Sequence, residues 1–369
     1  MKQQIMMNDV FKIIEDLAPK SLAYEWDNVG LQIGSANKPV KKIMITLDVL
    51  ERVVDEAIEK DVNLIIAHHP LLFKPLKQVN YDSPSGRILQ KLIKYDITVY
   101  AAHTNLDVAS GGVNDTLCSV LDLQSRRVLL DEKAKKLLKL AIYVPNTHEE
   151  QVREAISEAG AGHIGEYSHC TFKTQGQGTF KPLDGTNPFI GTKGKLEYVD
   201  EVKLETIVPE GILSAVLKEM EKAHPYEEVA YDIFPLENEG DRIGIGRIGE
   251  LDRTMTLEEF CKMIKVKLEV SQLRVTGDLS KPVKTVAVLG GSGEKYIHQA
   301  KKKGADVYIT GDMTFHTAQD AWQMGLAVID PGHYMEKVMK QSVKAYLEEK
   351  LHDVNIILSN TNTDPFQFI

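Results

Sequence analysis

The sequence predicts an α/β protein with two lobes and a smaller domain inserted between them. In both halves of the chain, continuous apolar runs alternate with amphipathic segments, which is typical of parallel or mixed sheets covered by helices. A middle segment has a different order of strands and helices, and 369 residues suffice for two or three domains. We therefore expect an N-terminal lobe over 1–128, an insert over 129–241 and a C-terminal lobe over 242–369.

The N-terminal lobe begins with an amphipathic helix over 10–17 and continues as short apolar strands separated by helices. The strands are expected over 43–47, 64–67 and 97–102, and the helices over 53–60 and 86–95. Open α/β sheets bind their ligands at the carboxyl ends of the strands. Polar residues just after these strands are therefore the first candidates for a functional site.

The C-terminal lobe repeats this pattern, with strands expected over 283–289, 306–310 and 326–329 and one long helix over 333–351. Its first strand is followed by Gly290-Gly291-Ser292-Gly293, which matches neither the Walker A spacing nor GxGxxG. We expect a tight strand-to-helix turn at these glycines. A backbone cradle for an anion is the alternative.

The middle segment reads as a complete small domain. Strands are expected over 138–144, 168–180, 201–208 and 228–234, and helices over 149–159 and 212–223. The resulting order β-α-β-β-α-β is that of a ferredoxin-like unit. Such a unit interrupts the larger domain rather than extending it.

Composition excludes several classes of protein. The formal net charge of −9 argues against nucleic-acid binding through a broad basic surface. The three cysteines show no CxxC spacing, which favours a reduced protein over a disulfide scaffold. We find neither a signal peptide nor an apolar stretch of membrane-spanning length. The cytoplasm is therefore the expected location.

Three groups of metal-competent side chains follow predicted strands. They are His68 and His69 ahead of Pro70, His103 with Asp107, and His333 with Glu336. Each group alone has an ordinary explanation: a core histidine, a polar turn, or an acidic residue in the first turn of a helix. Together they favour a metal site, because residues i and i+3 of a helix share one face and strand ends meet at one edge.

The donor set is imidazole and carboxylate without thiolate, which favours zinc, iron, manganese, cobalt or nickel over calcium. We place zinc first. Five ligands are counted, more than one catalytic zinc ion usually takes: His68, His69, Asp107, His333 and Glu336. They suit two ions about 3.5–4 Å apart with one bridging carboxylate. His103 is then a further ligand or a proton carrier, and Asp48, Asp312 and Asp330 are candidates to orient the ligand histidines.

These motifs resemble those of the NIF-three-like family, whose bacterial members are often labelled GTP cyclohydrolase 1 type 2 homologues. The matching residues are Trp26-Asp27-Asn28-Val29-Gly30-Leu31, His68-His69-Pro70, 103–107 with Gly111-Gly112, and Gly332-His333 with Glu336. The resemblance implies that the five counted residues bind a dinuclear metal centre, with His103 near it. It also implies a ring-like homohexamer with the metal sites facing an internal cavity.

The insert resembles the PII- or CutA-like domain of the longer family members. The matching residues are Ile164-Gly165-Glu166, Gly176-Gln177-Gly178-Thr179-Phe180, Asn187-Pro188 and His224-Pro225-Tyr226-Glu227-Glu228. For the last run, a structural turn with a trimer contact is preferred over a second ligand or metal site.

Two functions remain open. The first is a metal-dependent hydrolase acting on a nucleotide or another phosphorylated small molecule, with His103 or Glu336 moving protons. The second is a non-catalytic metal-binding or regulatory protein, whose PII-like insert senses a small ligand or recruits a partner. The cyclohydrolase label does not decide between them, because the well-known enzyme that opens the guanine ring uses one zinc ion with cysteine ligands. None of the three cysteines here adjoins a ligand group.

Overall fold

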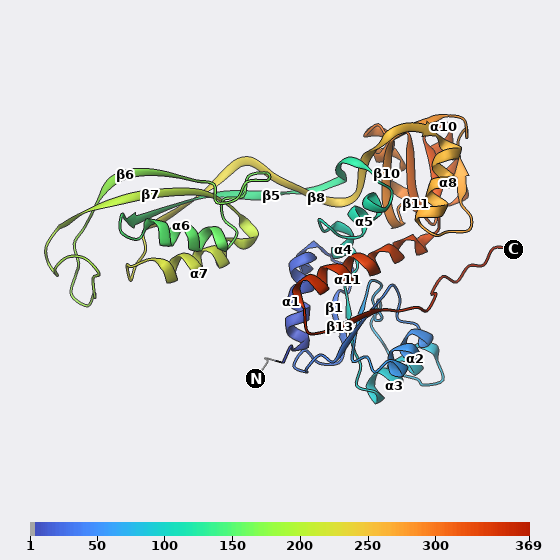
Figure 1. Ribbon diagram of the computed structural model, residues 1–369, viewed down its shortest axis with the longest axis horizontal. Coiled ribbons are helices and arrows are strands. Elements are labelled where there is room, and N and C mark those ends of the chain that lie inside the picture. Colours follow the sequence, from blue (N-terminus) through green and yellow to red (C-terminus); the bar gives the residue numbers. More distant parts are fainter. Residues whose placement is uncertain (1–3) are drawn as a thin grey trace. The chain divides into compact units, whose positions relative to one another are not determined.

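The computed structural model describes residues 4–369, without the side chains of 131–135, 239 and 241, and divides into two compact units (Figure 1). Unit 1 combines Met1–Glu132 with Ile243–Ile369, and unit 2 is Lys133–Arg242. Both ends of the chain therefore belong to unit 1, and unit 2 is inserted between them.

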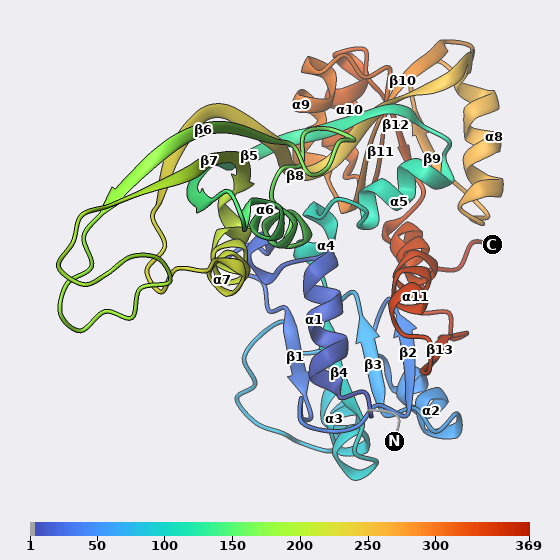
Figure 2. The same ribbon diagram turned by 60° about the vertical axis from the view of Figure 1, so that its left-hand side comes forward.

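Unit 1 contains a five-stranded sheet in the order β1-β4-β3-β2-β13 (Figure 2). The strands are β1 (Gly30–Ile33), β2 (Lys42–Thr46), β3 (Leu64–Ala67), β4 (Thr98–Ala101) and β13 (Asn355–Leu358). Only β1 is antiparallel to its neighbour. Since β13 pairs with β2, the end of the chain returns to the sheet that the N-terminal part began.

Helices cover both faces of this sheet because its strands are apolar on both sides. On one face, α2 (Glu51–Glu59) and α3 (Pro84–Lys94) bury Val53 and Leu92 against Ile65. On the other face, α1 (Met7–Leu17) and α11 (Met339–Lys350) bury Ile14 and Val343 in a separate core with Ile45.

A second sheet of unit 1 is built from the end of β8 (Tyr231–Thr256) followed by β10, β11, β12 and β9. Its remaining strands are β9 (Arg274–Thr276), β10 (Pro282–Ser292), β11 (Val307–Gly311) and β12 (Ala327–Asp330). The three strands β10, β11 and β12 are parallel, and β8 and β9 flank them antiparallel. The expected α/β class with mixed sheets is thus confirmed.

The helices of this second lobe also pack on both faces of its sheet. The core formed by α8 (Leu257–Lys267) contains Phe260 and Ile309, whereas α9 (Ile297–Lys302) and α10 (Phe315–Gln323) pack with Tyr308 and Val328. Two short helices, α4 (Thr104–Val108) and α5 (Val113–Val120), follow β4.

The prediction of one continuous helix over 333–351 was wrong. The chain forms a 3-10 helix over His333–Val338 and only then the α-helix α11. The apolar spacing across both segments resembles that of one helix, but Gly332 at φ 88° starts the tighter turn. Residues i and i+3 lie directly above one another in a 3-10 helix, so His333 and Glu336 are still brought to one side.

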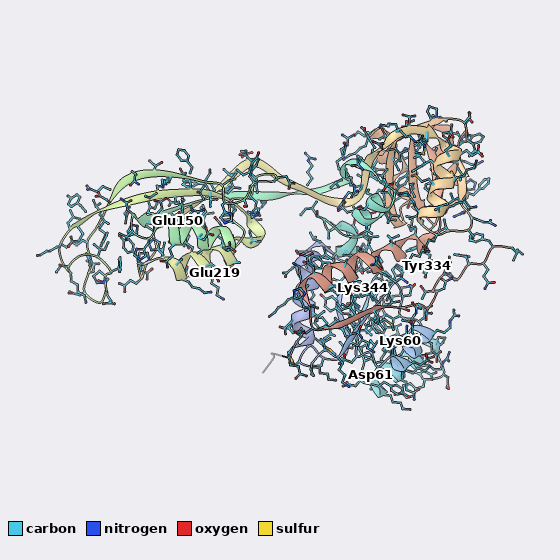
Figure 3. The ribbon with its side chains drawn as sticks, in the orientation of Figure 1. Lys60, Asp61, Glu150, Glu219, Tyr334 and Lys344 are labelled. Carbon is cyan, nitrogen blue, oxygen red and sulfur yellow. The ribbon has the colours of Figure 1, made fainter. Side chains whose placement is uncertain are left out.

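Unit 2 contains the second part of β5 (Gln124–Pro145), α6 (Glu149–Glu158), β6 (Thr171–Phe180), β7 (Glu197–Pro209), α7 (Leu213–Ala223) and the first part of β8. The strand order is β6-β7-β5-β8. Both helices share one core with the sheet, in which Ile156 and Met220 contact the cluster around Leu204. Figure 3 labels Glu150 on α6 and Glu219 on α7.

Within residues 4–369, every helix falls short of the length and apolar character that a membrane-spanning segment needs.

Candidate metal centre

The histidine pair lies just beyond the end of β3, as the sequence predicts. His68 is completely buried, and its Nδ1 lies 2.8 Å from the carbonyl oxygen of Ala102. Because a carbonyl only accepts, Nδ1 donates this hydrogen bond, and Nε2 is the ring nitrogen that faces the other candidate ligands. His69 points to other partners: its Nδ1 lies 2.7 Å from Oδ1 of Asp48, and its Nε2 lies 3.1 Å from Oε2 of Glu336.

The second group is positioned by the turn from β4 into α4. His103 precedes α4, and its Nδ1 lies 2.9 Å from Oδ1 of Asp27. Its ring centroid is 5.3 Å from that of His68 and 5.6 Å from that of His69. Asp107 lies within α4, where its side chain is buried.

The third group follows β12 through a turn closed by Asp330. The Asp330 carboxylate accepts hydrogen bonds from the backbone N–H groups of Met313 and Gly332. In the 3-10 helix that follows, the Nε2 atom of His333 lies 3.2 Å from Oε2 of Glu336. Asp330 thus shapes the turn and does not contact a ligand histidine.

The five predicted ligands form two groups that share Glu336. Oε1 of Glu336 faces His68 at 3.7 Å, and His68 Nε2 in turn lies 3.6 Å from Oδ1 of Asp107. Oε2 of Glu336 faces His69 and His333. In each group of three, the candidate ligand atoms all lie within 4.8 Å of one another, the spacing expected around a cation.

Two atoms of the first group show that the site suits a cation. His68 Nε2 and Asp107 Oδ1 are buried and have no hydrogen-bond partner among residues 4–369. Each unsatisfied buried polar atom costs about 1–3 kcal/mol. A divalent cation between them would satisfy both, whereas a neutral imidazole and a carboxylate at 3.6 Å make no hydrogen bond.

The pKa values of the candidate ligands are shifted by burial and by the charges of their neighbours. Burial, reinforced by the nearby Glu336 carboxylate, raises the pKa of Asp107 to about 7. Burial alone would also raise the pKa of Glu336, but the surrounding histidines outweigh it and lower that pKa well below its usual range. Burial opposes protonation of His69, yet hydrogen bonds to Asp48 and Glu336 raise its pKa to about 10.

His333 behaves like His69. Its hydrogen bond to Glu336 raises its pKa to about 9, against the effect of burial and with help from Asp312. Protonated imidazoles therefore balance the carboxylates of the metal-free centre. A divalent cation would take over that role and displace these protons.

Three histidines are oriented by carboxylates through Nδ1, which turns each Nε2 away from its carboxylate. The pairs are His69 with Asp48, His103 with Asp27, and His333 with Asp312 at 2.7 Å. Asp48 and Asp312 were expected in this role. Asp27 was not, although it lies in the motif Trp26–Leu31 that carries the family resemblance.

The expected turn at Gly290-Gly291-Ser292-Gly293 is instead the end of β10, which runs to Ser292 with an irregular register after Val288. Gly291 has φ 66°, and a Cβ atom there would lie 2.8 Å from Oε1 of Glu336. The N–H groups of Gly290 and Gly293 donate to Asn114 and Thr310. These two amides are engaged inside the protein, which speaks against an anion cradle.

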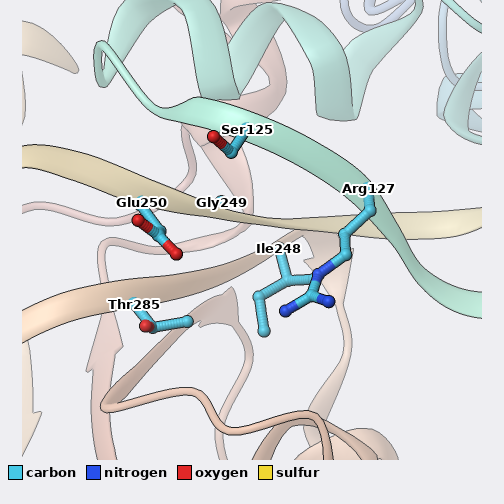
Figure 4. A pocket seen from close by; sticks show the side chains of 6 residues that line it. All are labelled: Ser125, Arg127, Ile248, Gly249, Glu250 and Thr285. Carbon is cyan, nitrogen blue, oxygen red and sulfur yellow. The ribbon is translucent and has the colours of Figure 1, made fainter.

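Two other features do not involve these ligands. The His224 ring has Nε2 at 3.0 Å from the carbonyl oxygen of Tyr143 and accepts from the Tyr226 N–H at Nδ1, which is a structural role. A shallow pocket of about 210 Å³ in unit 1 contains none of the candidate ligands (Figure 4). It is lined by Ser125, Arg127, Ile248, Gly249, Glu250 and Thr285.

Fold and site together define a two-sheet α/β protein with a buried cluster of histidines and carboxylates suited to a metal cofactor. The chain belongs to the Duf34/NIF3 (NGG1p interacting factor 3) family, whose model matches residues 5–365. This confirms the resemblance seen in the sequence motifs.

Relatives match the whole chain. A Bacillus subtilis protein named GTP cyclohydrolase 1 type 2 homolog is 55% identical over 373 residues, covering 100% of both chains. The crystal structure of a Bacillus cereus protein related to NIF3 has a TM-score of 0.94 at 51% identity, with 100% of both chains covered. A Staphylococcus aureus crystal structure, also with full coverage of both chains, has a TM-score of 0.76 at 34% identity.

Proposed function

We propose that this protein binds two divalent metal ions and acts as a metal-dependent hydrolase on a nucleotide or another phosphorylated small molecule. The observation that carries the proposal is the position of Glu336 between two groups of donors, with one carboxylate oxygen facing each. One ion would be held by His68, Asp107 and Glu336, and the other by His69, His333 and Glu336. The donor set favours zinc, with iron, manganese, cobalt and nickel as alternatives.

When bound, the ions would supply Lewis acidity towards phosphoryl oxygens and lower the pKa of water. The protein's own residues supply the rest of the chemistry. His103 is anchored on Asp27 through Nδ1, so its Nε2 is free to accept or donate a proton at the substrate. Its side chain is 17% exposed, whereas that of Glu336 is only 3% exposed. We therefore assign proton transfer to His103 and metal binding to Glu336.

The regulatory alternative draws support from unit 2. We propose that residues 129–241 form a ferredoxin-like domain of the PII or CutA kind, because its strand order β6-β7-β5-β8 with both helices in one core suits that fold. Such a domain would sense a small ligand or recruit a partner. The family resemblance further leads us to propose a homohexamer whose metal centres face an internal cavity.

The test is a screen of the full-length protein, stripped of metal and reloaded with zinc, manganese or iron, against nucleotides and phosphoesters. The name of the Bacillus subtilis relative places GTP in the panel. Glu336→Gln should abolish turnover because it weakens both ion sites. Glu348→Gln on α11 is the matched control, since the exposed Glu348 contacts only Lys344 among the ion pairs of residues 4–369.

Turnover that survives Glu336→Gln would contradict the assigned site. No turnover with any metal would reject the hydrolase and favour the regulatory function.

A further inference from the structure

Two exposed aromatic rings stand beside the assigned proton carrier. Trp26 is 60% exposed and Phe73 is 47% exposed. Their ring centroids lie 6.3 Å and 6.4 Å from that of His103, and both approach it edge to face. Because the His103 ring is in turn 5.3 Å from that of His68, a molecule resting on these aromatic rings would also adjoin the candidate metal centre.

The two rings come from different segments that are held together by hydrogen bonds. Asn28 donates from Nδ2 to the carbonyl oxygen of Leu72 at 2.6 Å, and the Leu72 N–H donates to Oε1 of Gln32 at 3.1 Å. Gln32 closes the network by donating to the carbonyl oxygen of Asn28 at 2.8 Å. Phe73 directly follows Leu72, and Trp26 lies two residues before Asn28, so this network links the two segments that carry the rings.

Trp26 is also supported from within its own segment. The ring of Tyr24 stacks on it at 5.6 Å with an interplanar angle of 15°, and Phe73 approaches at 5.9 Å and 68°. Asp27 holds His103 through one carboxylate oxygen and the backbone N–H of Thr104 through the other. The network that orients the proton carrier therefore positions the tryptophan as well.

We propose that Trp26, with Phe73 beside it, stacks against a planar heteroaromatic ring of the substrate, while the substrate's phosphate binds at the metal centre. This inference rests on the proposed hydrolase function and narrows it to nucleotides rather than simple sugar phosphates. Stacking suits a nucleobase because every base presents a π-face. We call Trp26 and Phe73 the ring site. The His103 ring neighbours both the Trp26 ring and the ring of the candidate ligand His68, so the proton carrier would adjoin the part of the substrate between base and phosphate.

Tryptophan fluorescence gives a direct test, because the chain contains two tryptophans, Trp26 and Trp322. The full-length, zinc-loaded Trp322→Phe variant leaves Trp26 as the single reporter. Guanosine 5′-monophosphate and guanosine should quench its emission. Ribose 5-phosphate should bind at least about tenfold more weakly than the nucleotide, because it lacks the stacked base. The reciprocal Trp26→Phe variant, which reports from Trp322 on α10, should show no quenching.

Calorimetry with the same three probes separates the ring site from the metal site. Trp26→Ala should lower the affinity for guanosine 5′-monophosphate to that for ribose 5-phosphate, while zinc content and ribose 5-phosphate binding stay unchanged. Trp26→Phe should recover a large part of the loss, since a ring remains to stack.

Equal affinity of the wild-type protein for the nucleotide and ribose 5-phosphate would overturn the ring site and leave the metal-dependent function standing. Quenching by guanosine, without zinc-dependent binding of ribose 5-phosphate, would support the ring site and contradict the hydrolase. Failure of acrylamide to quench Trp26 would mean that a second copy of the chain covers it, which also overturns the proposal.

Discussion

Nε2 of His68 and Oδ1 of Asp107 lie 3.6 Å apart, both buried, and neither has a hydrogen-bond partner among residues 4–369. The imidazole–carboxylate pairs His69–Asp48 and His333–Glu336 are closer, at 2.7 and 3.2 Å. The pair is therefore spaced for a cation between the two atoms rather than for a direct contact.

Asp107→Asn tests this pair. The amide keeps the shape of the carboxylate but loses its charge, so the zinc-loaded variant should hold about one ion fewer per chain than the wild type. Elemental analysis measures this directly. The control is Asp252→Asn, which changes an exposed aspartate and should leave the metal content unchanged.

Asp107→Asn should stabilise the metal-free protein, although it weakens metal binding. Burial raises the pKa of Asp107 to about 7, so its charged form is disfavoured in the folded state. Removing that charge should raise the Tm of metal-free Asp107→Asn by a few degrees at pH 8. Thermal unfolding in a chelator checks the result, and a clear fall in Tm would show that Asp107 is a purely structural residue.

The metal centre also predicts a pH dependence with a definite sign. The folded-state pKa values of His69 and His333 are raised to about 10 and about 9. Their contribution to the stability of the metal-free protein is therefore complete below the unfolded value near 6.5 and is lost as the pH rises through 9 to 10. Metal binding requires loss of the same protons and so strengthens over that range.

The difference in Tm between zinc-loaded and chelator-treated protein should accordingly grow from pH 6.5 to pH 9. Differential scanning calorimetry at several pH values measures it, and calorimetric titration in buffers of different ionisation enthalpy should show proton release on zinc binding. A difference that shrinks as the pH rises would contradict the assignment of both histidines as ligands.

His103→Ala should separate proton transfer from metal binding. We expect the metal content to stay at the wild-type level and the hydrolytic rate to fall by roughly 10²–10⁴-fold. Asp27→Asn should shift the pH profile of the rate, because Asp27 orients His103 through Nδ1. His298→Ala, at an exposed histidine of α9, is the control. Loss of metal from His103→Ala would make that residue a ligand instead.

Gly291→Ala tests how closely the end of β10 packs on the Glu336 carboxylate. Its φ of 66° strains any other residue, and the new Cβ would lie 2.8 Å from Oε1 of Glu336. Gly304→Ala is the matched control for this variant, since Gly304 also has a positive φ of 85° but open space around it. Both should lose about 1–2 kcal/mol of stability from backbone strain, and Gly291→Ala alone should also lose metal. Equal metal content in the two variants would contradict the contact.

Much of this centre could be predicted from local sequence patterns. The sequence predicts the strand over Leu64–Ala67 and the residues that follow it, because the apolar run ends abruptly at His68 and Pro70. The spacing of His333 and Glu336 also indicated a shared face, although the helix there is 3-10 and not α. Ligands carried by strand ends are predictable because strand ends coincide with changes in hydrophobicity.

Relations between distant segments could not be predicted in this way. No local pattern indicates that Asp27 lies 2.9 Å from His103, or that β13 pairs with β2 across the whole sequence. The sequence also does not predict that the Trp26 ring is exposed, because tryptophan side chains are highly buried on average. These features depend on tertiary packing, which brings together residues without any shared periodicity.

Anomalous diffraction at the zinc edge, from crystals of the zinc-loaded full-length protein, tests the central claim most directly. We predict two peaks per chain, one among His68, Asp107 and Glu336 and one among His69, His333 and Glu336, with the Glu336 carboxylate contacting both. A single peak, or peaks that do not contact Glu336, would contradict the dinuclear centre.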